Sequence, residues 1–106
     1  MKLRHSFASI VLLTTLIGPA VAGPSMSVNW KETRLAMEGC KARAVEILRE
    51  GGFTGFKVLS FAVYAERGDY SAMLRCAPSL AIMIVFVAGP EIEPCNSYMN
   101  DLRNRF

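Results

Sequence analysis

The sequence has few of the residues and motifs that most small enzymes use for catalysis or cofactor binding. Its one histidine, His5, lies near the start of the chain. If the first 22 residues are removed, no imidazole remains for a metal site or a general base. There is also no C-x-x-C pair, no P-loop and no strand-G-x-G-x-x-G-helix unit. We therefore expect a protein that is not an enzyme and carries no cofactor and no metal.

The sequence also has no large excess of positive or negative charge. The chain has 12 Lys and Arg against 9 Asp and Glu, and the loss of Lys2 and Arg4 with the first 22 residues leaves 10 against 9. Nucleic-acid binding depends on clustered basic residues. A near-neutral domain is therefore not expected to bind nucleic acid.

Residues 1–22 have the three-part layout of a secretory signal peptide. Lys2 and Arg4 precede an apolar run over 7–17, and Ala20-Val21-Ala22 forms a small-x-small cleavage site. An uncleaved signal anchor is the alternative. We expect cleavage after Ala22, a periplasmic or secreted location, and a single small α+β domain over 23–106. The longest later apolar run, 80–88, is too short to span a bilayer, so no stable membrane span is expected after cleavage.

The first element of this domain is predicted to be an amphipathic helix from Asn29 to about Glu50. Asn29 and Glu32 have the spacing of a capping box, and Gly51-Gly52 provides a stop. At 100° per residue the apolar residues fall on one side: Trp30, Met37, Cys40, Ala44, Ile47 and Leu48. Trp30 is interpreted as a lid on the core.

Three strands are expected next, over 56–65, 70–76 and 80–88. The first is rich in β-branched and aromatic residues, the second alternates, and the third is apolar throughout. A final helix is predicted to run from Pro94 to about Arg105. The fold class is therefore α+β: a three-stranded antiparallel meander with one helix before and one after, αβββα, with both helices most simply on one face.

This order of elements resembles that of double-stranded RNA-binding domains. Those domains carry a lysine-rich start to the last helix, where this chain has Pro90-Glu91-Ile92-Glu93-Pro94, so RNA binding is not implied. The chain also resembles short exported bacterial proteins of unknown function in its signal peptide, its size, and its Cys40, Cys76 and Gly89-Pro90 landmarks. That resemblance implies no activity.

Three cysteines in an oxidising compartment allow one disulfide and leave one thiol. Cys40 and Cys76 both lie on faces predicted to point inward, so their pairing is favoured. Cys40 with Cys95, or no disulfide, remain alternatives. With Cys40–Cys76 paired, Cys95 is a free thiol, either a reactive or dimer-forming one near a helix start or an inert, half-buried residue.

The third predicted strand would remain apolar on the side that the helices do not cover. Either Ala81, Met83, Val85 and Val87 or Leu80, Ile82, Ile84 and Phe86 must point away from them. An uncovered apolar face indicates a contact site. The first predicted strand adds either Leu59, Phe61 and Val63 or Phe56, Val58 and Tyr64. The interaction face is predicted to contain Leu59, Phe61, Val63, Met83, Val85 and Val87.

These patterns predict an exported interaction or structural module with one disulfide. The expected partner is another copy of the chain or another exported protein, and in a homodimer the face would meet itself across a two-fold axis. A carrier that receives an apolar ligand is the first alternative. A thiol-dependent enzyme is a weaker one.

Overall fold

The computed structural model describes residues 23–106, and the predicted signal peptide lies outside the described residues. Five strands and two helices make up this part of the chain, with a short 3₁₀ turn, η1, between the last two strands. Their bounds are β1 Ser25–Glu32, α2 Met37–Glu50, β2 Thr54–Val58, β3 Ala62–Arg67, β4 Tyr70–Ala77, η1 Pro78–Leu80, β5 Ile82–Gly89 and α3 Ile92–Arg105.

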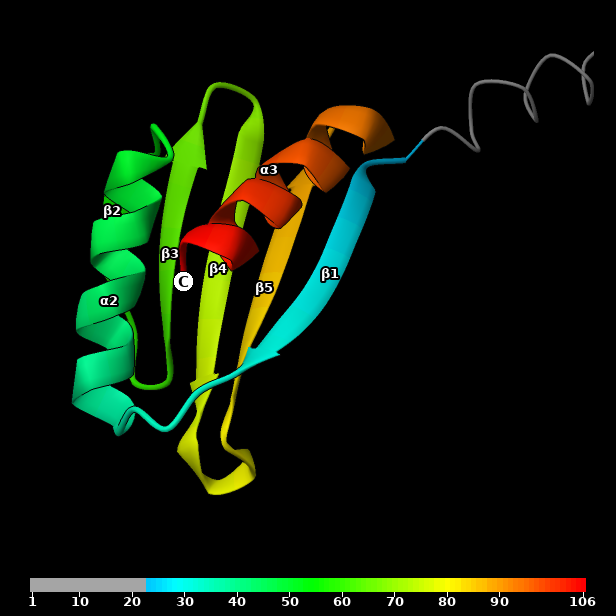
Figure 1. Cartoon of the computed structure of the whole chain (residues 1–106). Helices are drawn as coiled ribbons and strands as arrows, with labels where there is room; N and C mark the ends of the chain where they lie inside the picture. Colours follow the sequence, from blue (N-terminus) through cyan, green and yellow to red (C-terminus); the bar gives the residue numbers. More distant parts are fainter. Residues whose placement is uncertain (1–22) are drawn as a thin grey trace, which may run out of the picture.

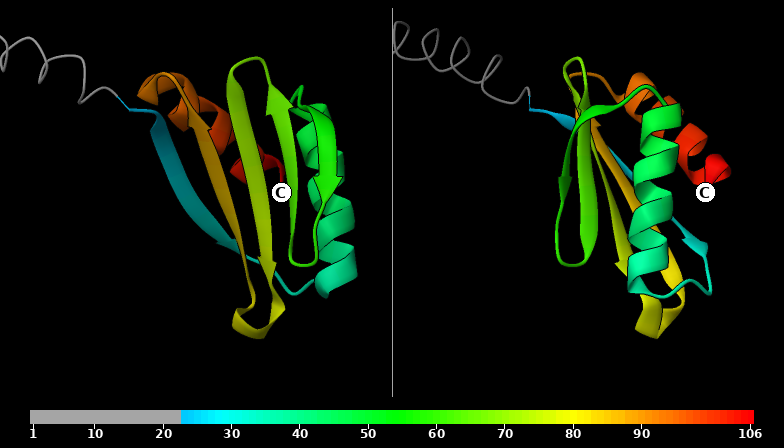
Figure 2. Two further views of the ribbon diagram at one scale, coloured as in Figure 1. Left: turned by 180° about the vertical axis from the view of Figure 1, so that it is seen from behind. Right: turned by 90° about the vertical axis from the view of Figure 1, so that its left-hand side faces the viewer.

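The strands form one antiparallel sheet in the order β1-β5-β4-β3-β2. Both helices lie on the same face of this sheet (Figure 1, Figure 2). Helix α2 packs against β2, β3 and β4, whereas α3 crosses β5 and β1. The opposite face, turned toward the viewer on the left of Figure 2, is not covered by any helix of residues 23–106.

The predicted three-stranded meander is therefore wrong, because the sheet has five strands. The first error lies at Asn29 and Glu32, which belong to strand β1 rather than to a helix. Asn29 Oδ1 accepts the backbone N–H of Trp30 at 2.8 Å, and the helix begins at Met37 without a side-chain cap. Because strand β1 precedes the first helix, the order of elements differs from that of double-stranded RNA-binding domains.

The second error concerns residues 56–65, which form a hairpin instead of one strand. Strand β2 ends at Val58, the chain turns through 59–61, and β3 begins at Ala62. The backbone N–H of Leu59 donates to the carbonyl of Ala62 at 2.7 Å and closes this turn. The turn contains no Gly, Pro, Asn or Asp, and Ser60 alone is too weak a signal to mark a hairpin.

The remaining predicted elements are present. Strand β4 covers the predicted 70–76. Of its four predicted inward residues, Ala72, Leu74 and Cys76 are buried, and Tyr70 is half-buried against the core. Strand β5 and helix α3 lie where the third strand and the last helix were expected. Both helices also lie on one face, as predicted.

The core lies between the two helices and the covered face of the sheet. Leu48 of α2, Leu74 of β4, Val85 of β5 and Leu102 of α3 are fully buried there. Cys40 and Cys76 form a disulfide that joins α2 to the end of β4 across 36 residues of sequence. The covalent link therefore crosses the core of the domain.

Candidate functional site

The open sheet face is the surface that α2 and α3 leave uncovered. Successive residues of a strand point to opposite faces. Their burial pattern assigns the residues of this face in the three strands nearest the β1 edge: Met26, Val28, Trp30, Ile82, Ile84, Phe86 and Met73. Among them, Met26 is 62% exposed, Val28 55% and Trp30 52%. The face is therefore apolar and in contact with solvent.

Cross-strand pairing arranges these side chains in rows. Val28 pairs with Phe86, and Phe86 with Met73, so an apolar row crosses β1, β5 and β4. In the next row Ile84 lies between Trp30 of β1 and Arg75 of β4. Neighbours in such rows are close enough for their side chains to contact one another. The rows form one continuous patch over three strands.

Strand β1 turns its apolar side toward this patch because its polar side is occupied by α3. The Ser27 hydroxyl donates to Asn96 Oδ1, and Lys31 Nζ donates to the carbonyl of Arg103 at 3.3 Å. Arg103 Nε in turn donates to the carbonyl of Trp30 at 2.8 Å. These hydrogen bonds hold the strand in a register that leaves Val28 and Trp30 on the outside.

A groove runs along the patch between β1 and β5. Its lining is almost entirely apolar: Val28, Asn29, Trp30, Ile82 and Ile84. It is open to solvent along its length rather than enclosed. Such a surface suits a flat partner better than a small molecule, whose site is usually a cavity that buries most of its surface.

The half of the face nearest β2 is polar. The Tyr64 hydroxyl donates to Glu66 Oε2 at 2.8 Å and lies 3.2 Å from Ser71 Oγ. The ammonium group of Lys57 lies over the Tyr64 ring, 5.8 Å from its centroid. Arg75 stands at the border between the apolar and the polar half. The apolar patch therefore has a defined edge within the sheet.

The structure divides the residues predicted for the interaction face between two places. Val63, Met83, Val85 and Val87 are 0% exposed and lie in the core beneath the helices, so they cannot form a contact surface. Leu59 and Phe61 are exposed, but they belong to the β2–β3 turn. The alternative set from the third strand is the one that points away from the helices, with Ile82, Ile84 and Phe86 in β5.

Strand β1 supplies the part of the face that the sequence analysis missed. Met26, Val28 and Trp30 alternate with Ser27 and Asn29, a period of two that is typical of a strand. The capping-box interpretation of Asn29 and Glu32 concealed this signal. Trp30, predicted as a core lid, instead lies outside the core with half of its surface exposed.

Cys95 is the free thiol, and it is fully buried. Its Sγ lies 3.7 Å from the carbonyl oxygen of Ser25, to which the thiol donates. Burial raises the pKa of the Cys95 thiol, which disfavours the thiolate that a nucleophile needs. The geometry is that of a structural cysteine rather than of a reactive one.

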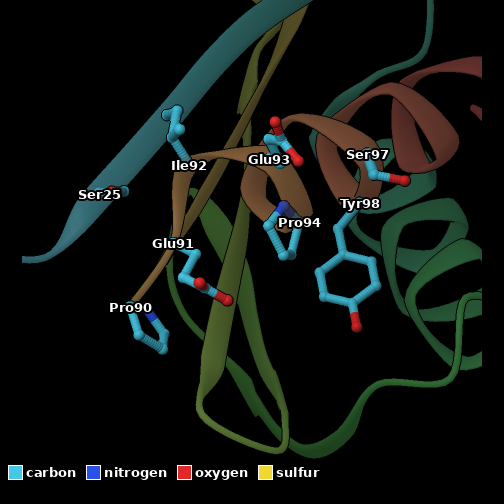
Figure 3. Close-up of a pocket in the computed structure, with 8 residues that line it drawn as sticks. All are labelled: Ser25, Pro90, Glu91, Ile92, Glu93, Pro94, Ser97 and Tyr98. Atoms are coloured by element: carbon cyan, nitrogen blue, oxygen red, sulfur yellow. The ribbon is translucent and has the colours of Figure 1, made fainter.

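A second depression lies where β5 leads into α3 (Figure 3). Its lining includes Glu91, Glu93, Pro94 and Tyr98. The two carboxylates point in different directions in Figure 3 and do not converge on one point. Within residues 23–106 no three His, Cys, Asp or Glu side chains are grouped so that they could hold a metal ion. This depression is not organised as an acid–base or metal site.

Neither a protein-family model nor a curated protein matches the chain. Among the helices of residues 23–106, none is long and apolar enough to cross a membrane.

Proposed function

We propose that this protein is an exported interaction module that associates with a second copy of itself through the open sheet face. The observation that carries the proposal is the continuous apolar patch formed by β1, β5 and Met73 of β4. A sheet with one free face normally presents alternating polar residues there. Strand β5 instead carries apolar side chains on both sides, which is typical of a strand buried on both faces.

Export is supported by two features. The first 22 residues have the pattern of a cleavable signal, and the disulfide between Cys40 and Cys76 is of the kind that persists in oxidising compartments. We infer that the protein works in the periplasm or outside the cell.

A second copy suits the patch because its rows are self-complementary. A two-fold axis parallel to β5 would place Ile84 and Phe86 against the same residues of the partner copy. It would also bring Trp30 of one copy over Arg75 of the other, twice in each dimer. A guanidinium over a tryptophan ring is a favourable contact. The polar half of the face, with Tyr64 and Lys57, would remain in water.

Sedimentation velocity over a range of concentrations tests this proposal. We expect the wild-type protein to dimerise and Val28→Glu to weaken dimerisation by about tenfold or more, because a carboxylate would be buried without a partner. Ile92→Glu is the matched control: Ile92 is also exposed but lies in α3, and the variant should dimerise like the wild type.

A wild-type protein that stays monomeric at every concentration would contradict the proposal. So would equal effects of Val28→Glu and Ile92→Glu. A lipid recovered by solvent extraction of the purified monomer would favour a carrier of apolar ligands, in which the groove lined by Val28, Trp30 and Ile84 would hold the ligand.

A further inference from the structure

Strands β1 and β2 form the two edges of the sheet, and the two edges differ. An edge strand presents backbone N–H and C=O groups to which another chain can add a strand. Strand β2 has only five residues, its register with β3 shifts between Thr54 and Lys57, and Lys57 is exposed there. Short, irregular and charged edges pair poorly with other strands. The β2 edge is therefore protected by its own shape and charge.

Strand β1 lacks the short length and the irregular register that protect β2. Its eight residues pair with β5 without a break in register. Three of them, Met26, Val28 and Trp30, are apolar and more than half exposed. Strand β1 forms the outer border of the sheet in Figure 1 and on the left of Figure 2. A long, regular and apolar edge normally pairs with another chain.

Two side chains occupy the β1 edge at Trp30. Asn29 Oδ1 accepts the backbone N–H of Trp30 at 2.8 Å, and Arg103 Nε of α3 donates to the Trp30 carbonyl at 2.8 Å. Both backbone groups of Trp30 therefore point away from β5. In an antiparallel pair every second residue turns both of its backbone groups to the same side. The groups of Met26 and Val28 thus also point outward, and no side chain of residues 23–106 bonds them.

The two bonds at Trp30 divide the outward edge of β1. Without them a partner strand could pair along residues 26–32, whereas with them only 26–28 is free. Pro24 limits the free stretch on its other side, since proline has no N–H to donate. Strands in sheets usually have about five or six residues. A ladder over 26–28 alone is therefore too short to hold another chain.

We propose that Arg103 and Asn29 form an edge cap that prevents β1 from pairing with β1 of another copy. Two β1 strands related by a two-fold axis at Val28 would place Val28 opposite Val28 and Met26 opposite Trp30. Opposed residues of an antiparallel ladder exchange both of their backbone hydrogen bonds. The cap occupies the two groups of Trp30 that this ladder needs. Contacts between copies are thereby kept away from the β1 edge, whether or not the open sheet face forms a dimer.

Hydrogen exchange of the backbone amides of Met26 and Val28 tests the proposal, measured by NMR at low and high protein concentration. In the wild type each amide should exchange at the same rate at every concentration, because the open sheet face provides no backbone bond to the edge. The double variant Asn29→Ala with Arg103→Met lacks both bonds at Trp30. Its two edge amides should exchange about tenfold or more slowly at high concentration, since pairing with a second copy protects them.

The double variant Asn29→Asp with Arg103→Gln is the matched control. The Asp side chain keeps an acceptor at the place of Oδ1. The Gln amide nitrogen lies as many bonds from the main chain as Arg Nε does, whereas Met has the same length and no donor. This control should behave like the wild type. The single variants Asn29→Ala and Arg103→Met should each show a smaller slowing than the pair, and circular dichroism checks that every variant is folded.

Three results would overturn the edge cap. They are concentration-dependent slowing in the wild type, no slowing in the variants that lose the bonds at Trp30, and equal slowing in the two double variants. A wild-type protein that stays monomeric contradicts association through the open sheet face, but it leaves the comparison between the two double variants unchanged. The two proposals can therefore fail separately.

Discussion

On the covered face of the sheet Leu74, Val85 and Val87 have no exposed surface, whereas on the open face Val28 and Trp30 expose about half of theirs. The covered face and the apolar half of the open face contain the same kinds of residue, and they differ in what covers them. Helices α2 and α3 complete the first core inside one copy of the chain. Within residues 23–106 no helix covers the second apolar surface, so apolar composition alone does not distinguish a buried face from an exposed one.

Truncation of one residue on each face gives the largest expected contrast. Leu74→Ala removes a fully buried side chain and leaves a cavity, so it should lower the free energy of unfolding by about 3 to 5 kcal/mol. Val28→Ala should change the stability of the monomer by no more than about 0.5 kcal/mol. Urea unfolding at a concentration where the protein is monomeric measures both. Similar losses would mean that the two faces are equally buried within one chain.

Removal of the disulfide is a second test of the difference between the two faces, because Cys40 and Cys76 both lie on the covered side of the sheet. Cys40→Ala with Cys76→Ala should lower the free energy of unfolding by about 3 to 4 kcal/mol, since the unfolded chain loses a loop of 36 residues. Reduction of the wild-type protein before urea unfolding should give a similar loss. An unchanged unfolding midpoint in both samples would show that the bond contributes nothing to stability.

Two glycines test how closely each element is packed. A Cβ on Gly89 would clash with the Tyr70 ring, so Gly89→Ala should lower the free energy of unfolding by about 1 to 3 kcal/mol. A Cβ on Gly39 would meet nothing closer than 3.8 Å, so Gly39→Ala should stabilise α2 by about 0.5 to 1 kcal/mol. Thermal unfolding of both variants measures these shifts. If the melting temperatures of both variants moved in the same direction, the close approach of Gly89 in β5 to the Tyr70 ring would be contradicted.

The smallest expected effect is a pH dependence that comes from the covered side. Burial raises the pKa of the Cys95 thiol above its ordinary value of 9.0, and burial also raises the pKa of the Tyr70 hydroxyl. The folded state therefore holds these protons more tightly than the unfolded state does. Their contribution to stability is complete below pH 9.0 and is lost as the pH rises through the raised values.

Urea unfolding from pH 8 to 11 measures this dependence. The decline in the free energy of unfolding should be shallower in Cys95→Ala, which lacks one of the two groups. Thiol counting with an alkylating reagent gives an independent check: one thiol should react after unfolding and none in the folded protein. Rapid alkylation of the folded protein would contradict the burial of Cys95.

The sequence predicted much of the covered side. The alternation in 70–76 identified the inward face of β4, and inward positions of Cys40 and Cys76 favoured the disulfide that is present. Helix α3 was recognisable from Pro94 and the spacing of Tyr98, Met99 and Leu102. These elements follow the usual rule that apolar periodicity marks the buried side.

The open side could not be predicted in the same way. Strand β5 is apolar on both sides, so its pattern does not indicate which side the helices cover, and the prediction selected Met83, Val85 and Val87 instead of Ile82, Ile84 and Phe86. Strand β1 places its apolar residues away from the core and its polar residues toward α3. Only the tertiary contacts with α3 decide this orientation.

Trp30 provides the most direct test of the central claim, that the open sheet face is an interface between two copies. It is the only tryptophan of the chain and lies in the apolar patch, on the edge strand β1, with about half of its surface exposed. Its fluorescence can be recorded as the wild-type protein and the Val28→Glu variant are diluted from high to low concentration. We predict that the wild-type emission maximum lies at a shorter wavelength at high concentration and moves to a longer wavelength on dilution, while the variant stays at the longer wavelength throughout. An emission maximum that is the same at every concentration in both proteins would contradict the claim.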